Sequence, residues 1–240
     1  MFKYSFLLIL LVALSSPAGM LVDKTRVIFN AGENTQGMTI MNVNDYPSFV
    51  QLWVDFGEVD NFKQSAEAPF ILIPPIFNLR SNEIKSIKLI YNGTPLPTDR
   101  ESLYWINIYE VPAIKQTLTK EQYLLMSMKT QIKLIYRPAQ LTTGVSLAGQ
   151  AVACSIKPDN RGQLVCRNNT GYYLSYNKID VVFDNQQYKA TRNLDLMIAP
   201  FSESSFSLTK MPQQPSEAGN RLIFNLINDQ GEIENIVKKF

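Results

Sequence analysis

The chain has 240 residues, enough for two small domains, with 23 Lys and Arg against 21 Asp and Glu and a formal net charge of +2. Histidine is absent, which excludes Ser-His-Asp and Cys-His catalysis and any metal site built on imidazole. The near-neutral charge supplies no overall field for nucleic acid or an acidic membrane surface. The 13 Phe, 11 Tyr and 13 Pro against only 11 Gly favour many short strands over long helices.

The amino-terminal segment contains the three parts of an export signal in order. Lys3 supplies the positive charge, Phe6–Leu14 is an unbroken apolar run, and Ser16–Ala18 offers the small residues that a signal peptidase reads. A spanning helix needs about 20 apolar residues, so this run is too short to cross a bilayer stably. We therefore predict that residues 1–18 are a cleaved signal peptide; the alternative is a buried N-terminal helix or an anchor.

The first half of the mature chain is predicted to form short strands. In Ser48–Phe56 the side chains of Val50, Leu52, Val54 and Phe56 fall on one face of an extended chain. Further segments rich in β-branched and aromatic residues are Pro69–Ile73, Ile84–Tyr91, Leu103–Val111 and Tyr123–Tyr136. Strands of this length and spacing favour an all-β fold built from antiparallel sandwiches.

The longest alternating run is Tyr123–Tyr136. Its even positions include Leu124, Met126 and Met128, and its odd positions are mostly polar. Alternating Leu and Met usually form the core face of their own strand. A cation within a strand, such as Lys133 here, is usually a solvated side chain.

A domain boundary is predicted after Pro138. The segment that follows, through Gln150, is small, polar and without clear alternation. Residues 19–138 and 139–240 are each near the size of one immunoglobulin-like sandwich. The second half repeats the strand pattern at Tyr172–Tyr176, Ile179–Phe183, Ser204–Leu208 and Arg221–Asn228.

The chain has two cysteines, Cys154 and Cys166, which would meet an oxidising compartment after export. The residues between them are rich in turn formers, and a hairpin centred on Asn160 would bring the two sulfurs face to face. We favour a structural disulfide over a pair of free thiols. The spacing is not the CxxC of a redox-active pair.

No motif in the sequence predicts an enzyme, a cofactor or a metal site. Gly32–Thr39 has the glycine spacing of a phosphate loop but lacks its lysine, so it is interpreted as a turn. The carboxylate pairs Glu58/Asp60 and Glu232/Glu234 are interpreted as solvated surface.

Five segments carry a resemblance to a known family: Thr25–Phe29, Pro69–Pro75 (PFILIPP), Leu96–Asn107 (LPTDRESLYWIN), Ile132–Pro138 (IKLIYRP) and Ile227–Gly231 (INDQG). Their order and content resemble the periplasmic pilus chaperones of chaperone–usher assembly, across nearly the whole mature chain. The third segment followed by the fourth is highly specific. The stretch from Pro112 to Lys133 resembles the short-loop subclass of that family.

The resemblance implies two immunoglobulin-like domains set at an angle like a boomerang, with a site in the cleft. Arg26 and Lys133 match two basic residues that bind the carboxylate at the end of a pilus subunit. Three residues match the alternating side chains that the family lends to the subunit: Leu124, Met126 and Met128. Three more match a buried ion network between the domains: Glu101, Arg137 and Asp229.

Two places depart from the family pattern. Asn168–Tyr173 lacks the two prolines that the family often shows, and Gln230 stands where an aromatic residue often follows Asn-Asp. These departures concern the second domain and leave the predicted binding edge intact.

The resulting hypothesis is a non-enzymatic periplasmic chaperone without cofactors. Its expected partners are pilus or fimbrial subunits and an outer-membrane usher, not nucleic acid, and the free protein is open to self-association through its exposed strand. The alternative is an exported two-domain adhesin or pilus structural component. A secreted hydrolase is disfavoured by the lack of histidine.

Overall fold

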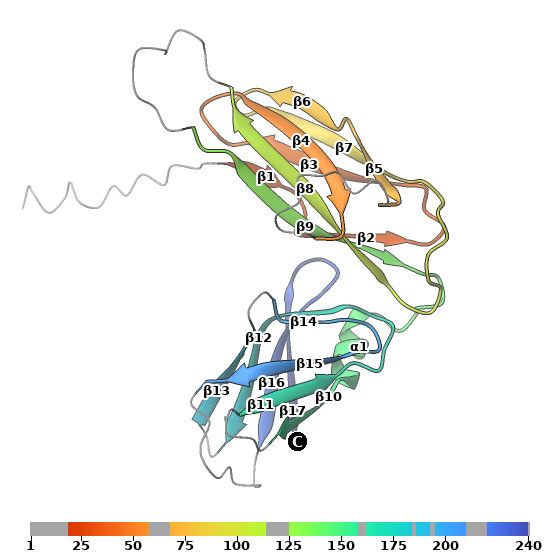
Figure 1. Ribbon diagram of the computed structural model, residues 1–240, viewed down its shortest axis with the longest axis vertical. Helices are drawn as coiled ribbons and strands as arrows, with labels where there is room; N and C mark the ends of the chain where they lie inside the picture. The colour runs from red at the N-terminus through yellow and green to blue at the C-terminus, as the bar shows by residue number, and fades with distance from the viewer. Residues whose placement is uncertain are drawn as a thin grey trace, which may run out of the picture.

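The computed structural model describes residues 19–57, 68–113, 125–157, 162–183, 186–192, 195–209 and 220–239. The predicted export signal and Leu124 lie outside these residues. The described part of the chain consists of strands and one short helix, arranged as two lobes that meet at an angle (Figure 1). The prediction of an all-β, two-domain molecule is therefore confirmed.

The first lobe packs two sheets face to face. One sheet contains β1 (Met20–Val22), β3 (Thr35–Asn42), β7 (Ile84–Tyr91) and β5 (Phe70–Ile73), in that order. The other contains β2 (Arg26–Asn30), β9 (Met128–Arg137), β8 (Ser102–Pro112), β4 (Ser48–Asp55) and β6 (Ile76–Leu79), in that order. All neighbouring strands are antiparallel except β2 and β9, which run parallel.

Alternation places the core of this lobe largely as predicted. Val50, Leu52 and Val54 of β4 are buried among apolar residues of both sheets. The prediction that Phe56 continues this face is wrong, since its side chain is 51% exposed. The carboxylate of Asp55 accepts hydrogen bonds from the Trp53 indole (3.0 Å) and the Gly57 amide (2.8 Å), and β4 ends there.

The second lobe is built on a continuous hydrogen-bonded sheet. In order, its strands are β10 (Ala153–Lys157), β11 (Gln163–Arg167), β15 (Glu203–Leu208), β13 (Gln186–Thr191), β12 (Leu174–Phe183), β16 (Arg221–Ile227) and β17 (Ile233–Lys239). A short β14 (Met197–Ile198) also pairs with β12. The path folds around a core that includes Phe183, Phe206 and Phe224.

Helix α1 (Val145–Ala151) was not predicted from the sequence. Its seven residues are too few to show a helical period. Val145 and Ala148, three residues apart on one helix face, pack onto the core of the second lobe. The segment that looked like an unpatterned connection therefore covers one end of that core.

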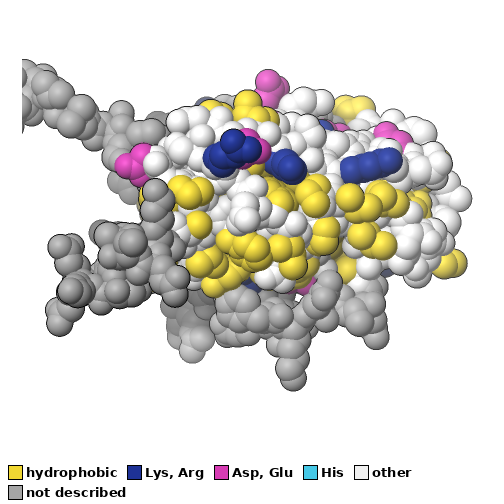
Figure 2. Space-filling view, turned by 90° about the horizontal axis from the view of Figure 1, so that it is seen from above, with side chains coloured by type: hydrophobic (Ala, Val, Ile, Leu, Met, Phe, Trp, Pro, Cys, Tyr) yellow, Lys and Arg dark blue, Asp and Glu magenta, His cyan; other side chains and the backbone are white. Residues whose placement is uncertain are grey.

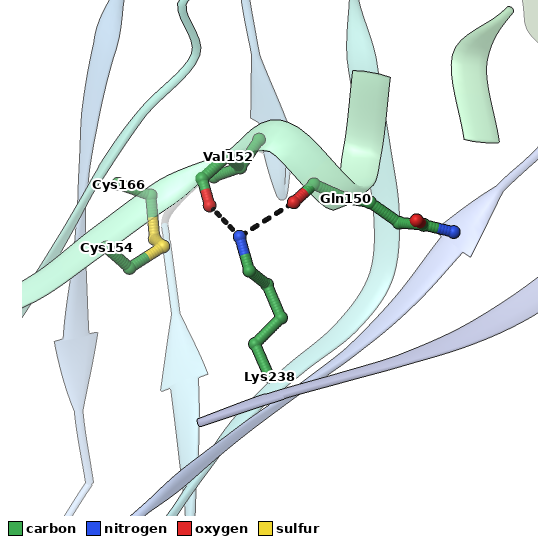
Figure 3. The surroundings of a disulfide bond; sticks show 5 residues. All are labelled: Gln150, Val152, Cys154, Cys166 and Lys238. Atoms are coloured by element: carbon green, nitrogen blue, oxygen red, sulfur yellow. Dashed lines mark hydrogen bonds between the residues drawn. A yellow bond between two sulfur atoms is a disulfide. The ribbon is translucent and has the colours of Figure 1, made fainter. Parts of the chain in front are cut away.

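The disulfide between Cys154 and Cys166 is present, as predicted (Figure 3). The two residues are directly opposed in the antiparallel pair of β10 and β11. Close by, the Lys238 ammonium donates to the carbonyl of Gln150 at 2.8 Å and to the carbonyl of Val152 (Figure 3). These bonds tie β17 to the end of α1.

We predict that the double variant Cys154→Ser/Cys166→Ser loses about 3 kcal/mol in the free energy of unfolding of the second lobe, because the bridge restricts the unfolded chain. Urea unfolding followed by circular dichroism measures this loss. The fluorescence of Trp53 and Trp105 is an internal control, since both tryptophans lie in the first lobe. Equal stability of the variant and the parent protein, or two reactive thiols in the native parent, would contradict the prediction.

Candidate functional site

Arg26 and Lys133 lie side by side where the two lobes meet. They are paired in the parallel register of β2 and β9, so their side chains leave the sheet on the same face. Arg26 is buried, with 9% of its surface exposed, and one of its Nη atoms donates to the carbonyl of Ile227 in the second lobe at 3.2 Å. Its Nε has no hydrogen-bond partner in the described part of the chain.

Lys133 reaches the second lobe in the same way. Its ammonium donates to the hydroxyl of Ser175 at 2.9 Å and lies 5.6 Å from the centre of the Trp105 ring. Burial lowers the pKa of Lys133 to about 8, while the charge of Asp195 opposes this shift and that of Arg26 adds to it. The ammonium is still largely protonated at neutral pH.

Burial also lowers the pKa of Arg26, and the charges of Asp229 and Glu101 oppose this shift. Two neighbouring cations in a partly desolvated place repel each other, and an anion between them would relieve that repulsion. The electrostatics of this place therefore favour a bound anion.

A network of ionic contacts joins the two lobes next to these cations. The Arg137 guanidinium donates from Nε to Glu101 at 2.7 Å, and from its two Nη atoms to Asp229 at 2.6 and 2.8 Å. The other oxygen of Glu101 accepts from the Tyr173 amide at 2.7 Å. Glu101 and Arg137 belong to the first lobe, whereas Asp229 and Tyr173 belong to the second, so the structure brings the three predicted network residues together across the lobe boundary.

One departure from the family motif has a clear structural setting. A Cβ atom at Gly171 would lie 2.6 Å from the carbonyl oxygen of Asp99 and 2.7 Å from Leu141. The Gly171 carbonyl also accepts a hydrogen bond from the Glu101 amide at 2.8 Å. A residue without a side chain is therefore required where the second lobe touches the Glu101 segment.

The edge of β9 is covered over only part of its length. β2 pairs with β9 from Lys133 to Arg137, and in the described part of the chain no strand pairs with that side of β9 before Lys133. On the other side, β8 pairs with β9 from Met128 onward. Among the described residues, the segment from Met128 to Ile132 is thus an open sheet edge.

The predicted donor residues on this edge face solvent where the structure describes them. Met126 is 72% exposed and Met128 is 52% exposed, and Leu125 beside them is 47% exposed. Further along the same strand face, Ile132 and Leu134 are buried in the core of the first lobe. On one face of β9, the side chains at the C-terminal end are therefore packed in the core of the first lobe, and the side chain at the N-terminal end is exposed to solvent.

Exposed hydrophobic side chains are frequent on the first lobe. Figure 2, which views the molecule from the first-lobe end, shows such side chains gathered over a broad area with Lys and Arg along one margin. Among the large hydrophobic residues that are exposed are Phe49, Ile71, Ile73 and Ile76. Such an area is typical of a surface that contacts other proteins.

Sequence reasoning missed the partners of the two cations. Trp105 and Ile227 lie in matched segments, but no pattern assigned either of them, or Ser175, to the two cations. Trp105 is opposite Lys133 in the pairing of β8 and β9, and the contact between the lobes brings Ser175 and the Ile227 carbonyl to the site. Within the described ranges, no group of three or more acidic or cysteine side chains could hold a metal ion. The helix that the structure describes is too short to cross a membrane.

Comparison with known proteins agrees with this geometry. Residues 19–142 match the family model described as "Pili and flagellar-assembly chaperone, PapD N-terminal domain". Residues 148–237 match the model described as "Pili assembly chaperone PapD, C-terminal domain". The two matches together span most of the chain.

Individual relatives are similar over almost their whole length. Chaperone protein HifB of Haemophilus influenzae is 30% identical over 92% of this chain and 88% of its own. The probable fimbrial chaperone YadV of Escherichia coli K12 is 31% identical over 90% of this chain and 88% of its own. The crystal structure of YadV chaperone superposes with a TM-score of 0.77, at 27% identity, over 92% of this chain and 99% of that one.

A further solved structure, the Salmonella enterica SafA pilin in complex with the SafB chaperone, superposes with a TM-score of 0.74 over 93% of this chain and 97% of that one. At 23% identity this likeness concerns the fold alone. The two matched family models and the relatives at 30% identity or more settle the assignment. The chain belongs to the family of pilus-assembly chaperones.

Proposed function

We propose that this protein is a periplasmic, non-enzymatic chaperone that completes the fold of a pilus or fimbrial subunit with its own β9 edge. The observation that carries the proposal is the open edge of β9, with the exposed Met128 at its start, the exposed Met126 just before it, and the buried Arg26 and half-buried Lys133 at its end. After capture the protein delivers the subunit to an outer-membrane usher, a role that is general to the family. The names of HifB and YadV as chaperones support this reading over a pilus structural component.

The physical basis is β-augmentation. A subunit whose sandwich lacks one strand exposes its core groove, and an added strand supplies both main-chain hydrogen bonds and alternating side chains. Here Met128 at the start of β9 and Met126 just before it are both exposed and stand at alternate positions of the chain, and we assign Leu124 to the same row. Methionine is flexible and polarisable, so it suits grooves of slightly different shape.

The two cations fix the register of this added strand. A slip of one residue would turn every donated side chain to the wrong face. The carboxylate at the end of the subunit, bound between Arg26 and Lys133, prevents such a slip. The burial of Arg26, the partial burial of Lys133 and the free Nε of Arg26 among the described residues support this assignment.

The proposed function also predicts how the chain is cleaved after export and where its two domains are divided. Residues 1–18 direct export and are removed after Ala18, which places the protein in the periplasm. The two domains meet after Pro138. The packing of Leu141 against the core of the second lobe supports this boundary.

We predict that Arg26→Ala and Lys133→Ala fold normally and bind a purified subunit more weakly by about 2–5 kcal/mol, because each removes one partner of a desolvated carboxylate. Binding titration measures the loss, and Lys88→Ala, at an exposed position on β7, is the matched control. A subunit ending in an amide should bind the parent and both variants equally. Undiminished binding of the normal subunit by either variant would count against the clamp.

We also predict that Met126→Glu weakens subunit capture, because the new carboxylate would have to enter an apolar groove. Ile233→Glu places the same charge at an exposed hydrophobic position of the second lobe and should leave capture unchanged. Recovery of subunits with each variant from periplasmic extracts distinguishes the two. Equal recovery would show that Met126 points away from the subunit.

The ionic network of Glu101, Arg137 and Asp229 gives a further prediction. Arg137→Met should lower the free energy of unfolding by about 3–5 kcal/mol, because it leaves the buried carboxylate of Glu101 without its counterion. The double variant Glu101→Gln/Arg137→Met should lose less, and Arg100→Met, in an exposed ion pair with Asp99, should change stability little. Urea unfolding compares the three. Equal losses for the single and double variants would refute the role of charge.

A further inference from the structure

One end of the first lobe buries a carboxylate without a complete set of partners. Glu110 of β8 is 8% exposed, and its Oε2 has no hydrogen-bond partner among the described residues. Glu110 pairs with Val50 of β4, and Ser48 lies two residues from Val50 on the same face of the sheet. The buried hydroxyl of Ser48 also has no hydrogen-bond partner among the described residues. Burial raises the pKa of Glu110. An unsatisfied buried acid of this kind calls for a donor that the described contacts do not supply.

Gly19 lies beside this carboxylate. Glu110 Oε1 is 3.9 Å from the position that a Cβ atom on Gly19 would occupy. The Gly19 nitrogen donates to the side-chain oxygen of Asn44 at 2.6 Å, and its carbonyl accepts from the Val43 amide at 3.1 Å. These bonds hold the buried Gly19 in a fixed place between the edge of one sheet and the β8 strand of the other.

Gly19 is also the residue that signal-peptide cleavage turns into a new amino terminus. Cleavage after Ala18 breaks the 18–19 amide and leaves an α-amino group, whose ordinary pKa of about 7.7–8.0 keeps it mainly protonated at neutral pH. The nitrogen keeps its donor to Asn44 and gains two N–H groups. We propose that this α-ammonium forms a buried ion pair with the Glu110 carboxylate, so that the two sheets of the first lobe are joined at this end only in the processed chain.

Each charge alone would be costly in this place, and together they satisfy one another. A buried carboxylate or ammonium without a partner is strongly unfavourable. For the same reason, removal of one member of a buried ion pair destabilises the fold. Before cleavage Gly19 offers Glu110 at most one neutral N–H, which is already given to Asn44. The unprocessed chain therefore has a weaker first lobe than the mature protein.

The position of the pair connects processing to subunit capture. Glu110 is directly opposite Met128 in the register of β8 and β9. Met128 begins the open edge that the proposed function assigns to the subunit. The ion pair thus anchors the end of β8 that supports the donor strand. The inference rests on the proposed cleavage after Ala18 and does not require that the carboxylate clamp be correct.

The experiment compares the mature chain with a chain that carries two extra alanines before Gly19, each in the parent, E110Q and D45N backgrounds. Asp45 is an exposed acid in the same lobe and is the matched control. Intact mass first establishes where each purified chain begins. Thermal unfolding is then followed by tryptophan fluorescence, which reports the first lobe alone.

We expect the extension to lower the unfolding midpoint by about 5 °C or more in the parent and D45N backgrounds, and by less than about 1 °C in E110Q. An equal drop in all three backgrounds, no drop in the parent, or a mature chain that does not begin at Gly19 would overturn the proposal. If E110Q does not fold, chemical labelling of the parent protein still tests the ion pair. Its terminal amine should react with an amine-selective reagent about tenfold more slowly in the native than in the unfolded state, and equal rates would refute the ion pair.

Discussion

The half-covered edge of β9 is the constraint on which the rest of the structure depends. A sheet edge with unpaired main-chain groups attracts other strands, and proteins normally cover or charge such edges. Here β2 covers β9 only from Lys133 onward, because its paired residues begin at Arg26. The exposed Met128 begins the uncovered part, and the exposed Met126 lies just before it. This feature suits the proposed capture of an incomplete subunit.

The cations where the two lobes meet are of two kinds: Arg137 is paired with carboxylates, and Arg26 and Lys133 are not paired with a carboxylate among the described residues. Arg137 is held by Glu101 and Asp229 and fixes one lobe against the other. Within the described residues, Arg26 donates to the Ile227 carbonyl and Lys133 to the Ser175 hydroxyl, and neither cation forms an ion pair with a carboxylate. The two lobes therefore present two cations whose desolvation is only partly offset by nearby carboxylates, an arrangement suited to recognition of an anion from a partner.

Local patterns in the sequence predicted the strands and the disulfide, since alternation and turn residues act over short distances. Patterns could not predict that Arg26 and Lys133 are neighbours, because a parallel pair of strands so far apart in the chain leaves no mark on spacing; the family resemblance supplied that expectation. Helix α1 was missed because it is short. Phe56 was misassigned because the hydrogen bonds of Asp55, a tertiary detail, end the strand. The partners of the two cations lie in the other lobe and depend on how the lobes dock.

Hydrogen exchange on the chaperone with and without a bound subunit tests the central claim most directly. Main-chain amides that pair with a captured strand exchange more slowly, and those elsewhere do not change. The account predicts slower exchange in the segment from Met126 to Ile132 when the subunit binds, with unchanged rates in β16 of the second lobe. Protection confined to other strands, with the β9 edge still exchanging freely in the complex, would contradict it.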